Sequence, residues 1–189
     1  NITQPTTTTL TNNAVEDLLP RVSDGNVVWQ RDSAGALDLF LHPTPGVASP
    51  ITGPGDDGQH AISGANVAWI KDDEHGGELW AWYPDLPLPG AYQITGDSVA
   101  DASPAISGER IVWVKGTGAG AEIWRHDPRA VQPTLQVTSN GVEDASPAID
   151  GTTLVWQQLD GTDFEIVVSI DDGAPQRLTR NAFDDHAPR

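Results

Sequence analysis

The sequence of 189 residues contains no cysteine, no methionine and only two lysines, Lys71 and Lys115. Without cysteine the chain can form no disulfide, no thiol nucleophile and no cysteine zinc site. Ten Lys and Arg residues stand against 27 Asp and Glu residues, which gives a formal net charge of -17. A surface of that sign repels phosphate groups, so we expect no nucleic-acid partner. No apolar run approaches the roughly 18 residues that cross a bilayer, so we expect no transmembrane segment.

The sequence is built from a repeating unit. Its first mark is a tryptophan that ends an aliphatic run, and the spacings between successive copies are 40, 44 and 43 residues. An acid that opens an apolar pair stands nine residues after each tryptophan. The tryptophans are Trp29, Trp69, Trp113 and Trp156, and the acids are Asp38, Glu78, Glu122 and Glu165. Positions that recur in register in this way make chance an implausible explanation.

A second mark of the unit is an aliphatic residue followed by threonine, with an aspartate five or six residues later. The pairs are Leu10-Thr11, Ile51-Thr52, Ile94-Thr95, Val137-Thr138 and Leu178-Thr179. The aspartates are Asp17, Asp57, Asp101, Asp144 and Asp185. Four of these aspartates are followed three residues later by proline, which indicates a turn at the same place in each unit.

Each unit contains four short β-type runs separated by Gly, Pro and Asp turns. Four strands in about 42 residues is the dimension of a β-propeller blade. We therefore predict an all-β single domain over residues 1–189 with four complete four-stranded antiparallel blades and no helix longer than a turn. The predicted units are about 18–57, 58–101, 102–144 and 145–185, and residues 6–13 are expected to form the outer strand of a neighbouring blade. The four repeat tryptophans should be buried between blades.

The third unit shows the full pattern, Pro104-Ala105-Ile106-Ser107-Gly108, then Ile111-Val112-Trp113, Glu122-Ile123-Trp124 and Val137-Thr138. This pattern resembles TolB-like β-propeller repeats, and the resemblance extends from about residue 6 to residue 188. It implies an extracytoplasmic setting, which is periplasmic, secreted or at the cell surface. TolB itself is a periplasmic component of protein interactions, whereas related propellers are surface modules or domains of enzymes. A shared fold does not by itself assign a chemistry.

The repeat pattern begins and ends with incomplete units. The strand predicted at 6–13 precedes the first complete unit, and residues 185–189 begin a fifth unit. An unpaired outer strand leaves an exposed edge. We therefore expect four blades that belong to a larger ring, either through further blades of a longer chain or through association of two copies.

The aspartate series is the first candidate site. If the repeat is cyclic, Asp17, Asp57, Asp101, Asp144 and Asp185 lie around one end of the channel, and such a ring of carboxylates suits a hard cation such as Ca²⁺. The structural alternative is that each aspartate caps a turn by accepting backbone N–H groups. The acids at the start of the third strand are equivalent in every unit, which argues against a catalytic pair, since a general acid and its partner need different environments.

Residues that break the repeat are the second candidates. Trp82 and Tyr83 extend the third strand of the second unit, Tyr92 follows a Pro-rich insertion, and His126 occupies a comparable position in the third unit. Aromatic residues near a rim loop can stack on a sugar or anchor a peptide. Local packing under the longer loop is the alternative.

These features favour a non-enzymatic extracytoplasmic propeller module that binds a partner protein or a surface polymer through its rim loops. One alternative is a carbohydrate-binding or carbohydrate-active propeller domain. A second alternative is a purely structural repeat module of a surface protein. The absence of an asymmetric catalytic constellation makes the enzyme hypothesis the weaker one.

Overall fold

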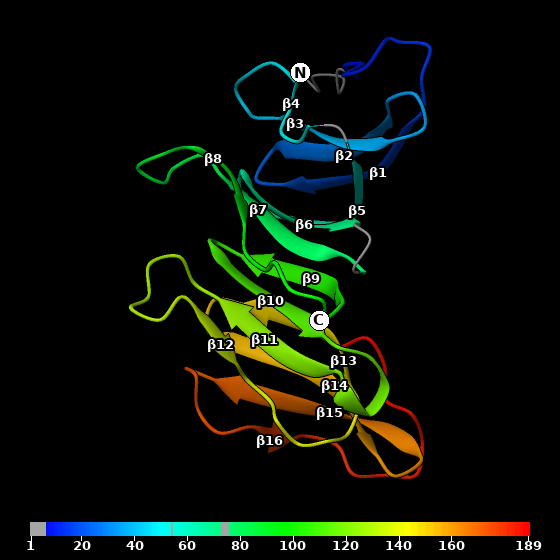
Figure 1. Cartoon of the computed structure of the whole chain (residues 1–189), viewed down its shortest axis with the longest axis vertical. Helices are drawn as coiled ribbons and strands as arrows, with labels where there is room; N and C mark the ends of the chain where they lie inside the picture. Colours follow the sequence, from blue (N-terminus) through cyan, green and yellow to red (C-terminus); the bar gives the residue numbers. More distant parts are fainter. Residues whose placement is uncertain (1–6, 54, 73–75) are drawn as a thin grey trace, which may run out of the picture.

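A computed structural model describes residues 7–53, 55–72 and 76–189, and this part of the chain contains four separate antiparallel sheets of four strands each. In every sheet the strands are paired in sequence order, so each sheet is a meander. Figure 1 shows the four sheets following one another along the long axis of the molecule. The short 3₁₀ turn η1 (Gly118–Gly120) is the one helical element of the described residues. The prediction of an all-β chain with four-stranded antiparallel blades is confirmed.

We call the sheets blades 1 to 4. Blade 1 contains β1 (Asp17–Ser23), β2 (Asn26–Asp32), β3 (Leu37–His42) and β4 (Ser49–Pro50). Blade 2 contains β5 (Asp56–Ser63), β6 (Asn66–Asp72), β7 (Glu78–Tyr83) and β8 (Gly90–Gln93). Blade 3 contains β9 (Asp101–Ser107), β10 (Arg110–Lys115), β11 (Glu122–His126) and β12 (Thr134–Gln136). Blade 4 contains β13 (Asp144–Asp150), β14 (Thr153–Asp160), β15 (Asp163–Ile170) and β16 (Gln176–Arg177).

Alternation along the strands gives every blade two apolar faces, because successive side chains point to opposite sides of a sheet. The forward face points to the following blade and the backward face to the preceding one. Between blades 1 and 2, Leu39 and Leu41 of the forward face pack with Val67 and Trp69 of the backward face. The same arrangement recurs at the next two junctions. The tryptophans of the four repeats are 0 to 3% exposed, so their predicted burial is confirmed.

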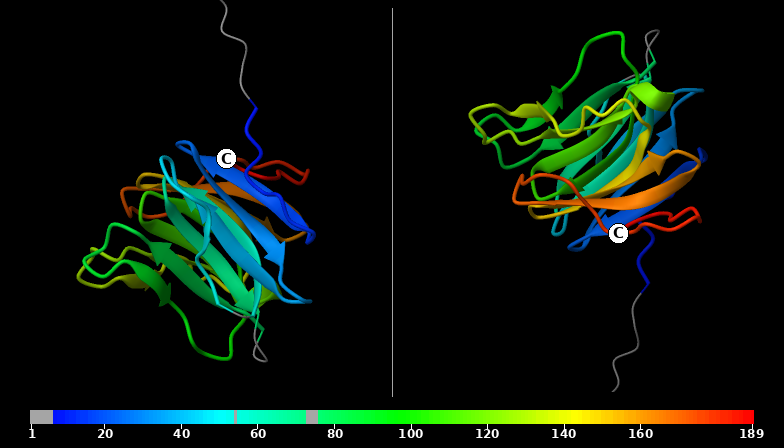
Figure 2. Two further views of the ribbon diagram at one scale, coloured as in Figure 1. Left: turned by 90° about the horizontal axis from the view of Figure 1, so that it is seen from above. Right: turned by 90° about the horizontal axis from the view of Figure 1, so that it is seen from below.

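A ladder of hydrogen bonds joins the first hairpin turns of successive blades. The N–H of Gly64 donates to Oγ of Ser23 at 2.9 Å, and that of Gly108 donates to Oγ of Ser63 at 2.9 Å. The N–H of Gly151 donates to Oγ of Ser107 at the same distance. Each serine therefore fixes the turn of the next blade. Viewed along the stack, the sheets fan out step by step (Figure 2).

The first strand of each blade begins earlier than the sequence indicates. We expected the repeated aspartates in loops before the strand, but Asp17, Asp101 and Asp144 are the first residues of β1, β9 and β13. A bulge follows them, and in β9 it includes Ser103, whose φ is +53° directly before Pro104. The bulge explains why proline is tolerated inside this strand. The repeated Asp-to-Pro spacing therefore marks a bulged strand start and not a separate turn.

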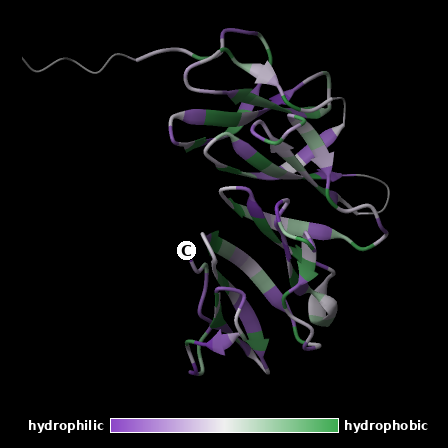
Figure 3. Ribbon diagram, turned by 90° about the vertical axis from the view of Figure 1, so that its left-hand side faces the viewer, coloured by the Kyte–Doolittle hydropathy of each residue, from purple (hydrophilic) through white to green (hydrophobic). Residues whose placement is uncertain are grey.

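The four blades are not closed into a ring, and blades 1 and 4 lie at opposite ends of the row (Figure 1). Residues 7–12 run beside blade 1 without strand pairing in this chain. Their expected role as an outer strand of a neighbouring blade stays a prediction. Hydrophobic stretches of the ribbon are concentrated in the strands (Figure 3). Among the residues with a described position, no helix has the length and apolarity needed to cross a membrane.

Candidate functional site

The repeated aspartates bind the repeated tryptophans. In each blade the indole N–H of the tryptophan donates to Oδ1 of the aspartate twelve residues earlier, at 2.8 to 3.1 Å. The pairs are Trp29 with Asp17, Trp69 with Asp57, Trp113 with Asp101 and Trp156 with Asp144. A buried indole N–H requires an acceptor. The carboxylate therefore has a structural partner that the sequence analysis did not identify, namely a side chain and not the backbone of a turn.

The threonine of the aliphatic-threonine pair that follows each blade completes this unit. Its hydroxyl oxygen accepts the backbone N–H of the third strand, for example Leu79 N–H to Thr95 Oγ1 at 2.8 Å and Ile123 N–H to Thr138 Oγ1 at 2.8 Å. Thr95 in turn donates its hydroxyl hydrogen to Oδ2 of Asp101 at 2.5 Å. The network thus ties the third strand of blade 2 to the first and second strands of blade 3.

The surroundings of the aspartates shift their pKa values in opposite directions. Burial raises the pKa of Asp57 and of Asp144 above the usual range of a carboxyl group. Burial also acts on Asp17, but hydrogen bonds from side chains around it, that of Arg31 first, outweigh it and lower its pKa to about 2. Nε of Arg31 lies 2.8 Å from Oδ1 of Asp17. The same position of the repeat therefore has a different electrostatic environment in blade 1 than in blades 2 and 4.

The structure does not bring the aspartates of different blades together. Each carboxylate is directed to its own tryptophan, and no group of three or more His, Asp or Glu side chains that could hold a metal ion occurs in the described ranges. The geometry gives a cation site at these residues no support, and calcium binding stays a prediction. Asp185 lies apart from the others in the chain segment after blade 4, where Asn181 Nδ2 donates to its Oδ2 at 2.7 Å.

The acids at the start of the third strands also have a structural role. Oε1 of Glu78 accepts the N–H of Asp97 at 3.1 Å, and Oε1 of Glu165 accepts that of Asn181 at 2.6 Å. Glu122 receives the N–H of Asn140 in the same way at 3.0 Å. In blades 2 to 4 these carboxylates fix the chain segment that follows the blade, as expected for scaffold contacts, whereas Oδ1 of Asp38 in blade 1 is buried without a hydrogen-bond partner in the described residues.

The four predicted ligand residues do not form one site. Tyr83 is 1% exposed, and its hydroxyl donates to the carbonyl of Glu109 in the first turn of blade 3 at 3.0 Å. His126 is also buried, with Nδ1 2.9 Å from Oγ1 of Thr134. Neither side chain can therefore stack on a ligand at the surface, and our expectation is corrected for both. Their rings contribute to packing under the rim.

Trp82 and Tyr92 are half-buried. Trp82 packs against the apolar cluster between blades 1 and 2, and its buried Nε1 has no hydrogen-bond partner in the described part of the chain. Tyr92 packs on Tyr83, with ring centroids 6.1 Å apart, and its hydroxyl donates to the carbonyl of Leu88. Local packing under the Pro-rich loop accounts for these contacts. A ligand role for Trp82 and Tyr92 stays a prediction.

The apolar tips of the rim loops were not predicted from the sequence. Three successive blades each expose one aliphatic side chain on the loop between the third and fourth strand, namely Val47 (84% exposed), Leu88 (77%) and Val131 (102%). These loops protrude on the same side of the molecule (Figure 1). The sequence contained part of this signal, because each loop carries a large apolar residue, but the loop of blade 2 carries both Leu86 and Leu88, and Leu86 packs on the core. Only the structure shows that all three are free of contacts with the core.

Hydrogen bonds and ion pairs hold this rim in place. The Thr44 hydroxyl donates to the carbonyl of Gly25 at 2.5 Å, which joins the loop of blade 1 to its first turn. Arg129 pairs with Glu109 in blade 3 at 2.5 Å. Asp172 of blade 4 receives both Arg110 at 3.0 Å and Arg125 at 3.1 Å from blade 3. The loops therefore present their tips from anchored bases.

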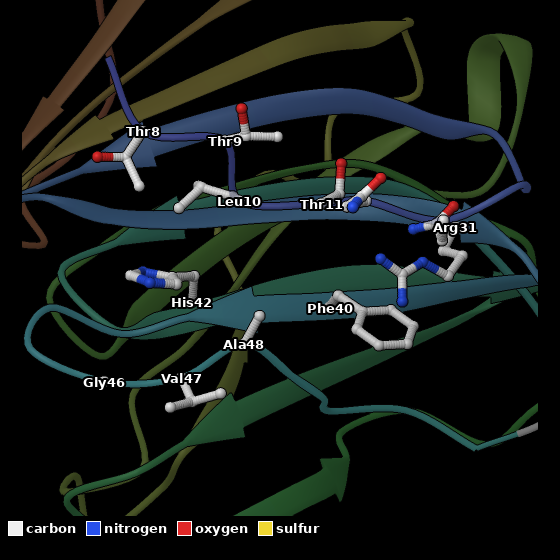
Figure 4. A pocket seen from close by; sticks show the side chains of 12 residues that line it. Thr8, Thr9, Leu10, Thr11, Arg31, Phe40, His42, Gly46, Val47 and Ala48 are labelled. Carbon is white, nitrogen blue, oxygen red and sulfur yellow. The ribbon is translucent and has the colours of Figure 1, made fainter. Parts of the chain in front are cut away.

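A cleft of about 460 Å³ lies on the backward face of blade 1, between the segment 8–13 and β3. In Figure 4 the threonines and Leu10 of that segment lie opposite His42, Ala48 and Val47, with Phe40 beside Arg31. The Arg31 guanidinium carbon lies 4.0 Å from the centroid of the Phe40 ring. A second hollow of about 210 Å³ continues on the same face and is lined by Leu10, Val27 and Trp29, among others.

The fold and these rim loops define a module of the β-propeller class with an open row of four blades. No family model matches the sequence, and no curated protein matches it. Solved structures match it in fold. A protein assigned as TolB from Agrobacterium tumefaciens is 16% identical with a TM-score of 0.59, and the match covers 82% of this chain and 62% of that one. TolB from Acinetobacter baumannii is 15% identical with a TM-score of 0.58, covering 90% of this chain and 45% of that one.

The β-propeller domain of the Trilobed protease from Pyrococcus furiosus is 10% identical with a TM-score of 0.63, covering 90% of this chain and 56% of that one. That domain has an open velcro topology. The chain spans less than two thirds of the length of each of these three structures. Identities this low show a shared propeller fold and no shared activity.

Proposed function

We propose that this chain is a non-enzymatic, extracytoplasmic propeller module that binds a partner protein through the rim formed by its third-to-fourth-strand loops. The observation that carries the proposal is the row of exposed aliphatic tips, Val47, Leu88 and Val131, on three successive blades. Single exposed apolar residues are common on protein surfaces. A repeated position that is apolar and exposed on three anchored loops is better explained by a contact surface.

The chemistry of the partner follows from the charge of the chain. A net charge of -17 around apolar tips favours a partner that offers a small apolar patch within a basic surface. The repeat-bound carboxylates support the absence of catalysis, because each of them accepts the indole N–H of its own tryptophan and serves as a structural contact. The resemblance to TolB-like repeats supports the extracytoplasmic setting.

The test compares capture of proteins from a cell-envelope extract of the source organism by three forms of the purified chain. The rim variant carries Val47→Ser, Leu88→Ser and Val131→Ser. The matched control carries Val15→Ser, Val99→Ser and Phe183→Ser, three exposed apolar residues that lie before blade 1, between blades 2 and 3, and after blade 4. We expect one defined protein to be bound by the wild-type chain and the control, and to be lost at least about tenfold with the rim variant. Equal capture by all three forms would contradict the proposal.

The carbohydrate alternative is tested on a glycan array with the wild-type chain and Tyr92→Ala. We expect no specific glycan signal. A defined signal that Tyr92→Ala removes would favour a sugar-binding module over a protein-binding one, because the half-buried Tyr92 ring is the aromatic surface available beside the Pro-rich loop.

A further inference from the structure

The outer faces of blades 1 and 4 correspond to the two faces that meet at each junction inside the row. Blade 4 presents a forward face, and blade 1 presents a backward face. At the junction of blades 2 and 3, Tyr83 of the forward face is 1% exposed, whereas its equivalent on blade 4, Ile170, is 57% exposed. Ile62 on the backward face of blade 2 packs on the cluster between blades 1 and 2, whereas its equivalent on blade 1, Val22, is 69% exposed. Among the described residues, no blade therefore follows on the forward face of blade 4, and none precedes on the backward face of blade 1.

The two hollows lie on the backward face of blade 1, where the forward face of a preceding blade would pack. Inside the row, Trp69 is covered by Leu39 and Leu41 of the preceding blade. Its equivalent Trp29 borders the hollow of about 210 Å³. The aliphatic residues Ile166 and Val168 on the forward face of blade 4 are the equivalents of Leu39 and Leu41. The apolar face that could cover the backward face of blade 1 is therefore present on blade 4, at the other end of the row.

The segments at the two ends are copies of each other. Residues 10–21 read LTNNAVEDLLPR and residues 178–189 read LTRNAFDDHAPR, which are identical at seven of twelve positions. Their contacts agree as well. Asn13 Nδ2 donates to Asp17 Oδ2 at 3.1 Å, and Asn181 Nδ2 donates to Asp185 Oδ2 at 2.7 Å. Leu19 and Ala187 both adopt a left-handed φ, of +45° and +51°.

The segment 178–189 already lies on blade 4 in the position that a following blade takes. Gln30 Nε2 donates to the carbonyl of Asp57, the start of blade 2, at 2.6 Å. The equivalent Gln157 Nε2 donates to the carbonyl of Asp185 at 3.0 Å. Asp185 nevertheless lacks the bond that defines the other aspartates, because no tryptophan indole donates to it in the described chain. Asp17 occupies the same repeat position and brings Trp29 with it.

We propose that two copies of the chain associate head to tail, with the backward face of blade 1 of one copy seated on the forward face of blade 4 of the other. In this junction the segment 10–21 of the first copy replaces the segment 178–189 of the second. The replacement exchanges near-identical contacts, and it adds the packing of Val22 and Val27 against Ile166 and Ile170, which are exposed or half-buried in the single chain. A contact between two different faces closes into a ring when both junctions form, or continues as a chain of copies.

The hydrogen bonds between the first hairpin turns of successive blades can continue across the proposed contact between the two copies. Ser23, Ser63 and Ser107 each accept the turn N–H of the blade beside them, and Asp150 holds that position in blade 4. Its carboxylate is a stronger acceptor than a hydroxyl and would receive the turn N–H of Asp24 from the other copy. Because both copies are strongly acidic, association should become tighter as salt screens their repulsion.

The test uses sedimentation of the purified full chain over a range of concentrations. We expect a species of twice the 20.1 kDa chain mass, or a larger head-to-tail oligomer. Val22→Asp disables the head and Ile170→Asp disables the tail, and each should weaken association at least about tenfold. The control is Val131→Asp, a fully exposed rim position outside both end faces, which should leave association unchanged.

Mixing the two variants identifies the head-to-tail contact. Val22→Asp retains a working tail and Ile170→Asp retains a working head, so an equimolar mixture should form a heterodimer although each variant alone remains monomeric. Deleting residues 182–189 removes most of the competing segment and should tighten association of the otherwise unchanged chain. A monomeric wild-type chain at all concentrations, association insensitive to both substitutions, or no recovery on mixing would overturn the proposal. Partner capture uses different residues, so its failure is distinguishable from failure here.

Discussion

At the scale of single residues, the indole–carboxylate pair sets the interior of each blade. Trp69 Nε1 and Asp57 Oδ1 lie 2.8 Å apart, and both side chains are buried. Trp69→Phe keeps most of the ring and removes the N–H, so a buried carboxylate loses its donor. We expect unfolding free energy to fall by about 1–3 kcal/mol, the usual effect of leaving a buried polar group unpaired.

Urea denaturation measures this loss, and a double-mutant cycle with Asp57→Ala isolates it. This substitution removes the acceptor of the Trp69 indole N–H, so each single variant breaks the pair. A coupling energy near zero between the two substitutions would show that the pair contributes nothing beyond packing.

Two equivalent aspartates should respond to pH in opposite ways. The pKa of Asp17 is lowered to about 2, so its contribution to stability is present above its unfolded value and is lost as pH falls from about 4 to about 2. The pKa of Asp57 is raised, so its contribution is present below the unfolded pKa and is lost as pH rises through the folded value.

The measurement is the urea midpoint between pH 7 and pH 2 for the wild-type chain, Asp17→Asn and Asp57→Asn. Asp17→Asn should flatten the loss of stability in acid, whereas Asp57→Asn should raise stability near neutral pH relative to its effect in acid. Identical pH profiles for the two variants would contradict the assignment of their environments.

The sequence showed which residues recur but not what they bind. The Asp-to-Pro spacing indicated a turn, and the partner of Asp101 is instead Trp113, which lies on the next strand. The adjacent antiparallel strands β9 and β10 bring these two side chains together. The bulge in β9 sets their distance, and the spacing between aspartate and proline in the sequence does not. Burial of Tyr83 was also hidden, because the carbonyl of Glu109 that receives its hydroxyl belongs to the next blade.

At the scale of elements, one threonine holds the third strand and the entry aspartate together. Thr138 is 5% exposed, and its Oγ1 accepts the N–H of Ile123 at 2.8 Å. Thr138→Val keeps the shape and leaves this N–H without its acceptor. We expect a loss of about 1–3 kcal/mol in unfolding free energy. The exposed Thr162→Val serves as the control and should change stability by less than about 0.5 kcal/mol.

The strand pattern was predictable because the alternation of side chains along a strand and the residues of a turn are both determined by neighbouring residues in the sequence. The four meanders follow from runs such as Ile111–Val114, which alternate between two buried faces, and from Gly-containing turns between them. Strand starts were less predictable, since β9 begins at Asp101 and passes through a bulge before Pro104. The exposed rim tips could not be inferred, because exposure of Val131 depends on how its loop is anchored by Arg129 and Glu109.

At the scale of the whole molecule, the blades differ in how many neighbours they have, although their sequences are equivalent. Among the described residues, blades 2 and 3 have a neighbouring blade on both faces, whereas blades 1 and 4 each have one on a single face. No single repeat encodes this difference. It arises from the position of a blade in the row, which is why the sequence pattern predicted the blades but left the closure of the row open.

The last prediction follows from this difference in neighbours. In architectures built from repeats, stability is approximately the sum of each repeat's own stability and the interfaces with its neighbours. The end blades have one interface instead of two, so they should open locally without unfolding the centre. Equivalent segments provide a matched comparison, because residues 27–30, 67–70, 111–114 and 154–157 all belong to second strands.

Amide hydrogen exchange of the dilute chain should therefore be slowest in 67–70 and 111–114 and faster in 27–30 and 154–157. Raising the protein concentration should slow exchange at the two end segments and leave the central ones unchanged, because head-to-tail association covers only the end faces. Equal protection of all four segments at low concentration would mean that the interfaces between blades contribute little, and that each meander is stable mainly through its own strand pairing.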